Sequence, residues 1–332
     1  MAERLILAAD IGGTKTNLAL FPEMGRGWIG APVAAETLRS GEYPTLEAML
    51  DRFAATHGRR PDAASFGFAG AVSAGRGVGT NIPWTADERA IADHLGLPRE
   101  RVHVVNDLVA TGYGIAALGD DDLATLLEGD PDPDGNAAIL AAGTGLGETT
   151  LVRIGGDLVP VASEGGHADF APRTDLELDV FRAIRDRLGR VSYESVLSGP
   201  GLVNVARVLH ERRGAAARWA EHEREGGDDG LPGLVSENGL AGRCDACAAS
   251  LELFVAIYGA EAGNVALRGL ALAGVYLGGG IAPKILPALK RDAFREAFLA
   301  KEPHRALLTR VTVRVIRNDR AALLGAGRLA TL

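Results

Sequence analysis

The sequence of 332 residues has few cysteines, few aromatic residues and no excess of positive charge. Its two cysteines, Cys244 and Cys247, form a single C-x-x-C pair, which alone cannot supply the four ligands of a structural zinc site. We interpret them as buried or surface cysteines of a helix rather than as a redox or metal pair. The net charge of −8 argues against nucleic acid or an anionic membrane as the main partner.

Long hydrophobic runs are also absent. The apolar run before Asp10 is too short for the hydrophobic region of a signal peptide. The longest uncharged apolar stretch, about 269–283, is shorter than a membrane span and rich in glycine. These absences predict a cytoplasmic protein that binds no membrane.

Two common nucleotide-binding motifs are missing as well. No G-x-x-x-x-G-K-[ST] sequence follows the first strand, which argues against a P-loop, and no G-x-G-x-x-G follows it, which argues against a Rossmann dinucleotide site. What the chain has in quantity is glycine, with 44 residues, and apolar residues, at 47%. The length favours two domains, and the composition is typical of an α/β protein with many tight turns.

One local design, a buried strand followed by a glycine turn and a second strand, occurs once in each half of the chain. The first example is "LILAADIGGTKTNLAL" and the second is "AAILAAGTGLGETTLV". In the first, backbone N–H groups of the glycines and the Thr14 hydroxyl could bind phosphate, and Asp10 could hold a hydrated Mg²⁺. The alternative is a plain glycine hairpin with an aspartate at its turn.

Three further motifs have both a structural and a functional interpretation. "YLGGGIAPKIL", with Gly279 and Gly280, is either a packed glycine turn or a surface for a planar base. In "SEGGHADF", two glycines bring Glu164 and His167 close enough to bind sugar hydroxyls, although a single histidine is more often structural. Glu194, before a Gly-Pro-Gly turn, is by itself typical of a helix surface.

In "RVHVVNDLVATGYG" a β-branched apolar run stops at a polar pair, Asn106 and Asp107, and a helical pattern follows. Asp107 is either the N-cap of that helix or a catalytic base, or both. A carboxylate at a helix N-terminus should have a lowered pKa and be a weak base. A weak base suffices if the substrate hydroxyl becomes acidic only as the new O–P bond forms.

In this order the motifs resemble those of the bacterial ATP-dependent glucokinase family, within the hexokinase/actin-like sugar kinases. The resemblance covers about residues 5–328 and rests most on "SEGGHADFAP" and "VLSGPGLVN". It implies phosphorylation of glucose at its 6-hydroxyl by ATP with Mg²⁺. Another hexose (fructose, mannose or an N-acetylhexosamine) remains open as the substrate.

The resemblance also implies roles for individual residues. Asp107 accepts the proton from the 6-hydroxyl, and Asp10 acts through Mg²⁺. The residues implied to contact the sugar are Asn81, Asn106, Asp107, Glu164, His167 and Glu194. Those assigned to the nucleotide are Asp10, Gly12, Gly13, Thr14, Lys15, Gly143, Thr144, Gly145, Gly279 and Gly280.

The implied fold is a two-lobed, ribonuclease H-like α/β fold with a mixed five-stranded sheet in each lobe and a cleft between the lobes. The expected small domain spans 1–112 and 318–332, with the last helix returning to it, and the large domain spans 113–317. A homodimer is also implied.

Related repressor/ORF/kinase proteins carry zinc-binding cysteines soon after the "GH" of this motif. None stand there in this chain, so we predict no zinc. Two other classes remain as alternatives. A sugar-responsive regulator would need a DNA-binding segment, which the sequence lacks. An actin-like ATPase would leave the Glu164, His167 and Glu194 set without a use.

Overall fold

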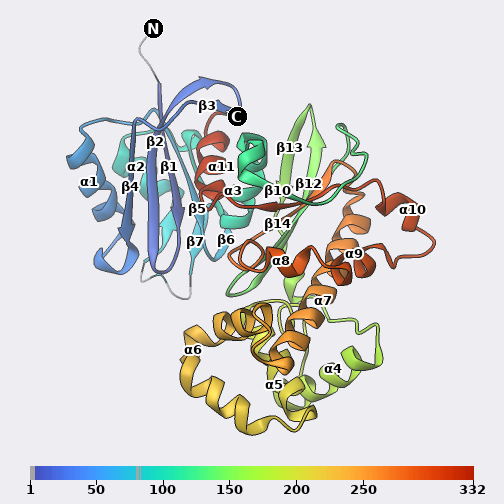
Figure 1. Ribbon diagram of the computed structural model, residues 1–332. Helices are drawn as coiled ribbons and strands as arrows, with labels where there is room; N and C mark the ends of the chain where they lie inside the picture. The colour runs from blue at the N-terminus through green and yellow to red at the C-terminus, as the bar shows by residue number, and fades with distance from the viewer. Residues whose placement is uncertain (1–3, 80–81, 83) are drawn as a thin grey trace. The chain divides into compact units, whose positions relative to one another are not determined.

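The computed structural model describes residues 4–79, 82 and 84–332 (Figure 1). The chain divides into two compact units. Unit 1 consists of residues 1–122, 158–162 and 318–332, and unit 2 of residues 123–157 and 163–317. The sequence predicts boundaries at 112/113 and 317/318. Each unit is α/β, with a mixed sheet and helices.

The sheet of unit 1 has six strands. These are β1 (Leu5–Ile11), β2 (Lys15–Gly25), β3 (Trp28–Ile29), β4 (Ala34–Arg39), β5 (Ala63–Phe68) and β9 (Val102–Asn106). Their order is β3-β2-β1-β5-β9, and β4 also pairs with β2. The predicted count of five is wrong here, because β2 has 11 residues and pairs with both β4 and the short strand β3.

Strand β1 is antiparallel to β2, whereas β5 and β9 run parallel to it. β1 and β5 are almost entirely buried, as the continuous apolar run Leu5–Ala9 predicts. Three short strands form a separate sheet, namely β6 (Ala71–Ser73), β7 (Arg76–Val78) and β8 (Ala86–Asp87). The segment β13 (Asp157–Val161) is counted mainly with unit 1.

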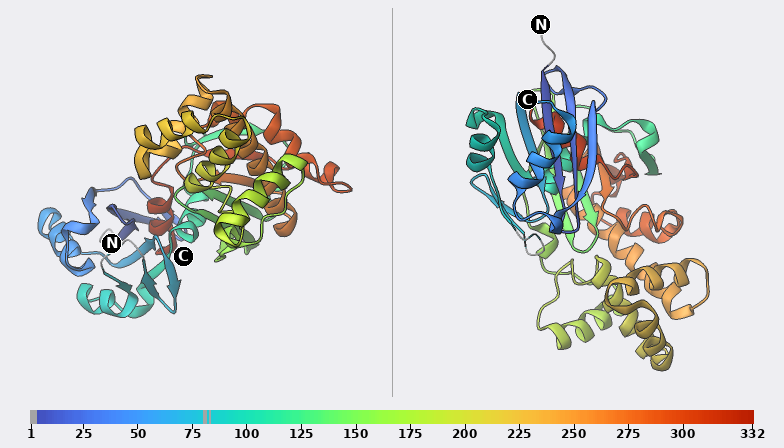
Figure 2. Two further views of the ribbon diagram at one scale, coloured as in Figure 1. Left: turned by 90° about the horizontal axis from the view of Figure 1, so that it is seen from below. Right: turned by 90° about the vertical axis from the view of Figure 1, so that its left-hand side faces the viewer.

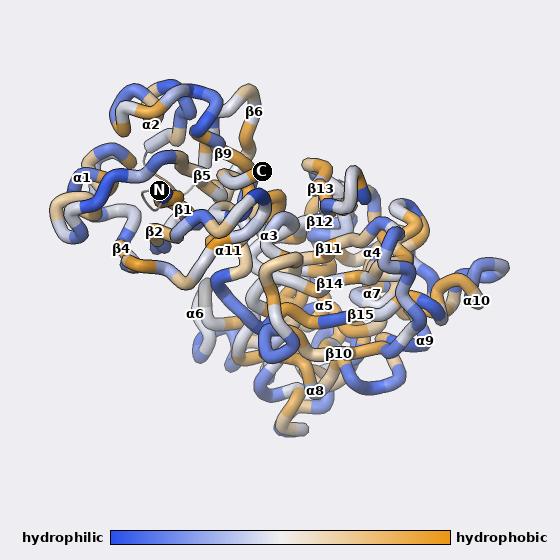
Figure 3. Tube along the Cα trace, turned by 90° about the horizontal axis from the view of Figure 1, so that it is seen from above, coloured by the Kyte–Doolittle hydropathy of each residue, from blue (hydrophilic) through white to orange (hydrophobic). Residues whose placement is uncertain are grey.

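The outer helices of unit 1 have the ends that the sequence predicts. Helix α1 (Leu46–His57) ends at Gly58 and α2 (Glu88–Leu95) at Gly96, and both glycines are left-handed, with φ of 63° and 65°. Hydrophilic and hydrophobic residues alternate along both helices (Figure 3), so each buries one face and exposes the other.

Two other helices, α3 (Asp107–Gly114) and α11 (Ala321–Leu329), lie side by side in unit 1 (Figure 1). Their backbones approach closely because each helix places a glycine against the other. A Cβ on Gly325 would stand 1.8 Å from the Ala110 carbonyl oxygen, and a Cβ on Gly114 would stand 2.2 Å from the Ala321 carbonyl oxygen. Helix α11 thus packs on α3 and β1, which belong to the first part of the chain.

Unit 2 has a second mixed sheet, in which strands follow the order β10-β15-β14-β11-β12. Their bounds are Leu123–Leu127 for β10, Ala137–Ala142 for β11, Leu146–Ile154 for β12, Gly274–Gly278 for β14 and Val313–Ile316 for β15. β11 and β12 form the second strand–glycine–strand unit that the sequence predicts, while β14 lies parallel to β11.

The helices of unit 2 are α4 (Asp175–Leu188), α5 (Gly199–Arg212), α6 (Ala216–Leu240), α7 (Asp245–Gly269), α8 (Leu286–Leu289), α9 (Asp292–Leu299) and α10 (Arg305–Leu308). The helices that span 175–269, yellow-green to orange, gather together in both views of Figure 2. Length and composition alone would let α7 cross a membrane, but 78% of its most apolar window is buried in the structure.

Helix α6 corrects one expectation. The charged, glycine-rich sequence around "AARWAEHEREGGDDGLPG" predicts a solvated insertion, yet it forms two helical segments that meet at Gly227, whose φ is 57°. Trp219 and His222 are 5% and 0% exposed. Trp219, Leu231 and Val235 of α6 join the core of unit 2, where α6 packs against α5 and α7, whereas charged residues such as Arg218 and Glu225 are exposed.

Candidate functional site

The loop between β1 and β2 is held by hydrogen bonds from a neighbouring segment. The Gly12 N–H donates to the Lys15 carbonyl at 2.9 Å, which closes the turn. The Ser40 hydroxyl donates to the Gly12 carbonyl at 2.6 Å, and its N–H donates to the Thr14 carbonyl at 3.1 Å. Ser40 was not singled out from the sequence, because its contact with Gly12 spans 28 residues and leaves no local motif.

Asp10 stands near the carboxyl end of β1, where three parallel strands finish together. In the register, Asp10 lies opposite Gly67 of β5, and Gly67 lies opposite Val105 of β9. A Cβ on Gly67 would stand 3.7 Å from the Cα of Asp107. Because Gly67 in the middle strand has no side chain, the start of α3 can approach the sheet. Asp10 and Asp107 therefore lie at the same end of the sheet. Ligands of α/β proteins bind at this end of the strands.

The start of α3 differs in detail from the sequence-based interpretation. Asn106, not Asp107, is the N-cap: its side-chain oxygen accepts from the Leu108 N–H at 2.9 Å. The Asn106 amide also donates to the Gly70 carbonyl at 3.1 Å. Asp107 is the first residue of the helix, and one of its carboxylate oxygens accepts from the same Leu108 N–H.

The expected low pKa of Asp107 is wrong. Burial removes water from its carboxylate, and the nearby negative charge of Asp10 acts in the same direction, so the pKa rises to about 6. The hydrogen bonds at the helix N-terminus oppose this change and are outweighed. Burial likewise raises the pKa of Asp10, although a hydrogen bond from Asn17, with 3.2 Å between Nδ2 and Oδ2, lowers it. The Asp107 carboxylate is thus a stronger base than that of an aspartate at a solvent-exposed helix N-terminus.

In unit 2 the loop Gly143–Gly145 joins β11 to β12. The Gly143 N–H donates to the Gly145 carbonyl at 2.9 Å, and the Gly143 carbonyl accepts from the Gly199 N–H at 2.8 Å. Gly199 begins α5, so the Gly-Pro-Gly turn predicted from the sequence contacts the glycine loop directly. Thr144 lies between the two glycines and is exposed.

Glu194 and His167 come together beside this loop. One Glu194 carboxylate oxygen accepts from the Leu146 N–H at 2.9 Å, and the other lies 3.8 Å from the Nδ1 of His167. The segments are joined by the backbone, since the Glu194 N–H donates to the Gly166 carbonyl at 2.8 Å. A Cβ on Gly166 would stand 2.0 Å from the Leu146 carbonyl oxygen, so the residue before His167 must be small.

These polar groups of unit 2 are accessible. The side chain of His167 is 54% exposed and that of Glu194 32%. Glu164 is exposed and precedes the 3₁₀ turn Gly165–His167. Carboxylates and an imidazole in this setting accept and donate hydrogen bonds to a polar ligand without a large desolvation cost.

Gly279 and Gly280 lie next to the end of β11. Gly279 has a φ of 77°, and a Cβ there would stand 2.2 Å from the Ala142 carbonyl oxygen, so the turn requires glycine. The Ile281 N–H donates to the same carbonyl at 3.2 Å. Both glycines are exposed. The packed-turn interpretation is therefore correct for Gly279, and the exposed backbone leaves the nucleotide interpretation open.

The predicted site residues thus form two groups, one in each unit. Asp10, the loop Gly12–Lys15, Asn106 and Asp107 belong to unit 1. The loop Gly143–Gly145, the Glu164, His167 and Glu194 set, and the turn at Gly279 belong to unit 2. Asn81 lies outside the described residues.

The unit 1 group suits a divalent cation. Asp10 offers a carboxylate from a buried strand end, and the Asn17 amide donates to this carboxylate while its oxygen accepts from the Thr37 hydroxyl at 2.8 Å. Mg²⁺ prefers oxygen ligands of this kind and keeps several waters. Together these residues provide a carboxylate ligand for a cation, a glycine loop whose backbone N–H groups could bind phosphate, and a carboxylate base. Phosphoryl transfer requires groups of these three kinds.

The α/β arrangement of this chain is similar to that of solved sugar kinases. The crystal structure of a glucokinase from an Antarctic psychrotroph matches 99% of both chains with a TM-score of 0.87 at 27% identity. The glucokinase of Nostoc sp. is 37% identical over 98% of both chains, and that of Synechocystis sp. is 38% identical over 96% of both. The family model described as Glucokinase matches residues 7–332. This chain belongs to the glucokinase family.

Proposed function

We propose that this chain transfers the γ-phosphoryl group of ATP to the 6-hydroxyl of glucose, giving glucose 6-phosphate and ADP. The observation that carries the proposal is the match to the family over nearly the whole chain, residues 7–332. Relatives named glucokinase extend over the same length at 37% and 38% identity. No comparison favours fructose, mannose or an N-acetylhexosamine as the substrate.

Asp107 is the residue that we assign as the catalytic base. It accepts the proton of the 6-hydroxyl as the O–P bond forms, and it orients that oxygen toward the phosphorus. Its pKa of about 6 keeps it ionised at neutral pH while making it more basic than an aspartate in water. Asn106 fixes the helix start behind it and adds a polar contact to the sugar, with Asn81 assigned to the same sugar.

Two glycine loops are assigned to the phosphates. Gly12, Gly13, Thr14 and Lys15 contribute backbone N–H groups, a hydroxyl and an ammonium group, and Gly143, Thr144 and Gly145 contribute a second exposed turn. Asp10 holds Mg²⁺ through water. When bound, this ion neutralises charge on the transferring phosphoryl group. Gly279 and Gly280 offer exposed backbone to the base of the nucleotide.

The glucose hydroxyls contact Glu164, His167 and Glu194. The supporting geometry is the 3.8 Å approach of His167 to Glu194, which places a donor and an acceptor side by side, both accessible. An actin-like ATPase has no use for this set. We propose further that the protein acts in the cytoplasm, in glycolysis, as a homodimer.

A sugar panel with detection of ADP tests the proposal. Glucose, fructose, mannose and N-acetylglucosamine are each supplied with ATP and Mg²⁺, and polyphosphate replaces ATP in a parallel series. We expect ADP release with glucose and formation of glucose 6-phosphate, detected by its specific dehydrogenase. 6-Deoxyglucose, which lacks the acceptor hydroxyl, should give no sugar-dependent ADP. Equal turnover of ATP with and without sugar would contradict the proposal.

A further inference from the structure

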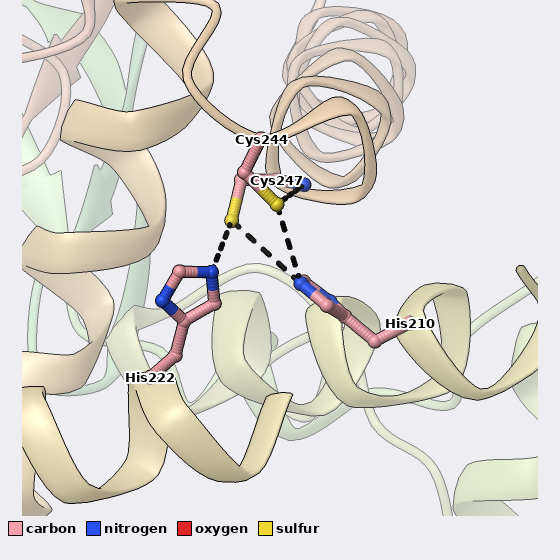
Figure 4. A group of neighbouring side chains, drawn as sticks. All are labelled: His210, His222, Cys244 and Cys247. Atoms are coloured by element: carbon pink, nitrogen blue, oxygen red, sulfur yellow. Dashed lines mark hydrogen bonds between the residues drawn. The ribbon is translucent and has the colours of Figure 1, made fainter. Parts of the chain in front are cut away.

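Four side chains that no step of the proposed reaction uses meet inside unit 2, as Figure 4 shows. His210 comes from the last turns of α5 and His222 from the first half of α6. Cys244 is the N-cap of α7, and Cys247 lies one turn into it. One ligand atom from each residue lies within 4.8 Å of the other three.

The distances fit a tetrahedron around one ion. The Sγ of Cys244 lies 3.4 Å from the Nε2 of His210, and the Sγ of Cys247 lies 3.9 Å from the same nitrogen. The Sγ of Cys247 lies 3.6 Å from the Nε2 of His222. Zinc bonds of about 2.3 Å to sulfur and about 2.0 Å to nitrogen, at tetrahedral angles, separate S from N by about 3.5 Å.

Outer contacts orient the rings toward a common point. The Nδ1 of His210 lies 2.7 Å from the Ala206 carbonyl oxygen, which fixes the tautomer with a lone pair on Nε2. The Nδ1 of His222 faces the Glu225 carboxylate at 3.8 Å. The Cys247 N–H donates to the Sγ of Cys244 at 3.3 Å, an outer contact that holds this sulfur in place.

The cluster is enclosed. His210, His222 and Cys247 are 0% exposed and Cys244 is 9% exposed. Four polar groups gathered in a core otherwise built of apolar side chains are costly unless something satisfies them.

We propose that His210, His222, Cys244 and Cys247 bind one structural Zn²⁺ ion. Two thiolates and two imidazoles in a tetrahedral set are typical of zinc, and four protein ligands leave no position for substrate. The ion joins α5, α6 and α7. The prediction of no zinc considered the cysteine pair without partners and the segment after His167, whereas the two histidines reach the pair from other helices.

The consequence for the fold concerns α6. Its first half is separated from the second by the break at Gly227, and Trp219 is the buried apolar side chain that this half contributes to the core, so few apolar contacts fix it. A bond from His222 to zinc ties this segment to α5 and α7. Removal of zinc should therefore loosen 216–226 more than the remainder of unit 2.

Metal content of the full-length protein is the first measurement. After expression with zinc supplied and purification without chelator, mass spectrometry should find about one zinc per chain. Exchange for Co²⁺ should give the strong visible absorption of a tetrahedral site and a thiolate-to-cobalt charge-transfer band in the near ultraviolet. Absence of bound metal, or cobalt bound without the charge-transfer band, would overturn the proposal.

A variant and its matched control separate the cluster from adventitious metal. His222→Gln keeps the size of the side chain but removes one ligand, and zinc affinity should fall by more than the about 100-fold that loss of an outer contact can cost. His304→Gln makes the same change at an exposed residue of unit 2 and should leave affinity unaltered. Equal zinc affinity in the two variants would refute the assignment. Circular dichroism shows whether each remains folded, and Cys247→Ser, judged by its cobalt spectrum, replaces His222→Gln if that variant unfolds.

Discussion

The two groups of candidate site residues differ in how much water reaches them. In unit 1 the carboxylates of Asp10 and Asp107 are withdrawn into the end of a buried sheet, and both have raised pKa values. In unit 2, His167 and Glu194 lie at the surface of a glycine turn, with 54% and 32% of their side chains exposed. Desolvation suits groups that take part in proton transfer, whereas exposure suits groups that exchange water for sugar hydroxyls.

If this difference reflects function, changes in unit 1 reduce turnover and changes in unit 2 reduce affinity. The largest effect is expected for Asp107→Asn. The variant cannot accept a proton, and kcat should fall by about 10²- to 10⁴-fold, with a small change in KM for glucose. Steady-state kinetics with a coupled ADP assay measures both constants.

The control for this variant is Asp93→Asn, at an exposed position of α2 in the same unit, which should keep the wild-type kcat. Thermal unfolding of both variants establishes that they are folded. Turnover within a few-fold of wild type in a folded Asp107→Asn protein would remove Asp107 from the chemistry.

The next effect concerns unit 2. Glu194→Gln weakens charged hydrogen bonds, each worth about 1.5–3 kcal/mol, so KM for glucose should rise by about 10- to 100-fold. kcat should change much less, and KM for ATP should stay near its original value. Glu237→Gln, on an exposed position of α6, is the matched control. A fall in kcat as large as that of Asp107→Asn would abolish the distinction between the two groups.

A smaller effect is expected for Gly145→Ala. The new Cβ would stand 2.6 Å from a carboxylate oxygen of Glu194, so that side chain must move and lose its bond from the Leu146 N–H. Loss of one hydrogen bond of about 1 kcal/mol raises KM for glucose by about five-fold. At Gly143 an added Cβ meets nothing within 4 Å, so Gly143→Ala should not change KM for glucose.

The smallest change is a shift along the pH axis. A base must be ionised, so kcat/KM should fall as the pH drops below the Asp107 pKa of about 6. Asp10→Asn removes a neighbouring negative charge and should lower this pKa, which carboxyl-carbon NMR can follow without activity. Asp93→Asn should leave the titration in place, and an unchanged pKa in Asp10→Asn would show that Asp10 does not act on Asp107.

The same pKa carries a consequence for stability. The folded-state pKa of Asp107 lies above the ordinary value of 3.8, so the protonated form is favoured by folding. Its contribution to the free energy of unfolding is present below about pH 4 and is lost as the pH rises through 6. Asp107→Asn should therefore be at least as stable as wild type at pH 7, as measured by urea unfolding.

Much of the fold was accessible from local sequence patterns. Continuous apolar runs such as Leu5–Ala9 identify strands buried on both faces, and glycines such as Gly58 and Gly96 mark helix ends because the left-handed conformation suits them. The order of the glycine and acidic motifs was enough to identify the family. These features depend on residues that are close in the sequence.

What escaped prediction depends on residues far apart in the sequence. The pKa of Asp107 follows from burial and from Asp10, neither of which is visible in "VVND". The histidines that contact the cysteine pair lie far from it in the sequence: His210 precedes Cys244 by 34 residues, and His222 precedes Cys247 by 25. These separations are not the usual spacing of a zinc motif. The charged composition of α6 concealed its buried face for a similar reason, since only a few residues, such as Trp219, define that face.

The close packing of α3 against α11 has a consequence during synthesis. Asp107 stands at the start of a helix whose facing partner, residues 321–329, emerges from the ribosome more than 200 residues later. The nascent chain therefore carries its base on an incompletely packed helix until translation is nearly finished. A chain truncated before residue 321 would contain every polar residue assigned to the reaction. It would still lack α11, the helix that packs against α3, which begins at Asp107.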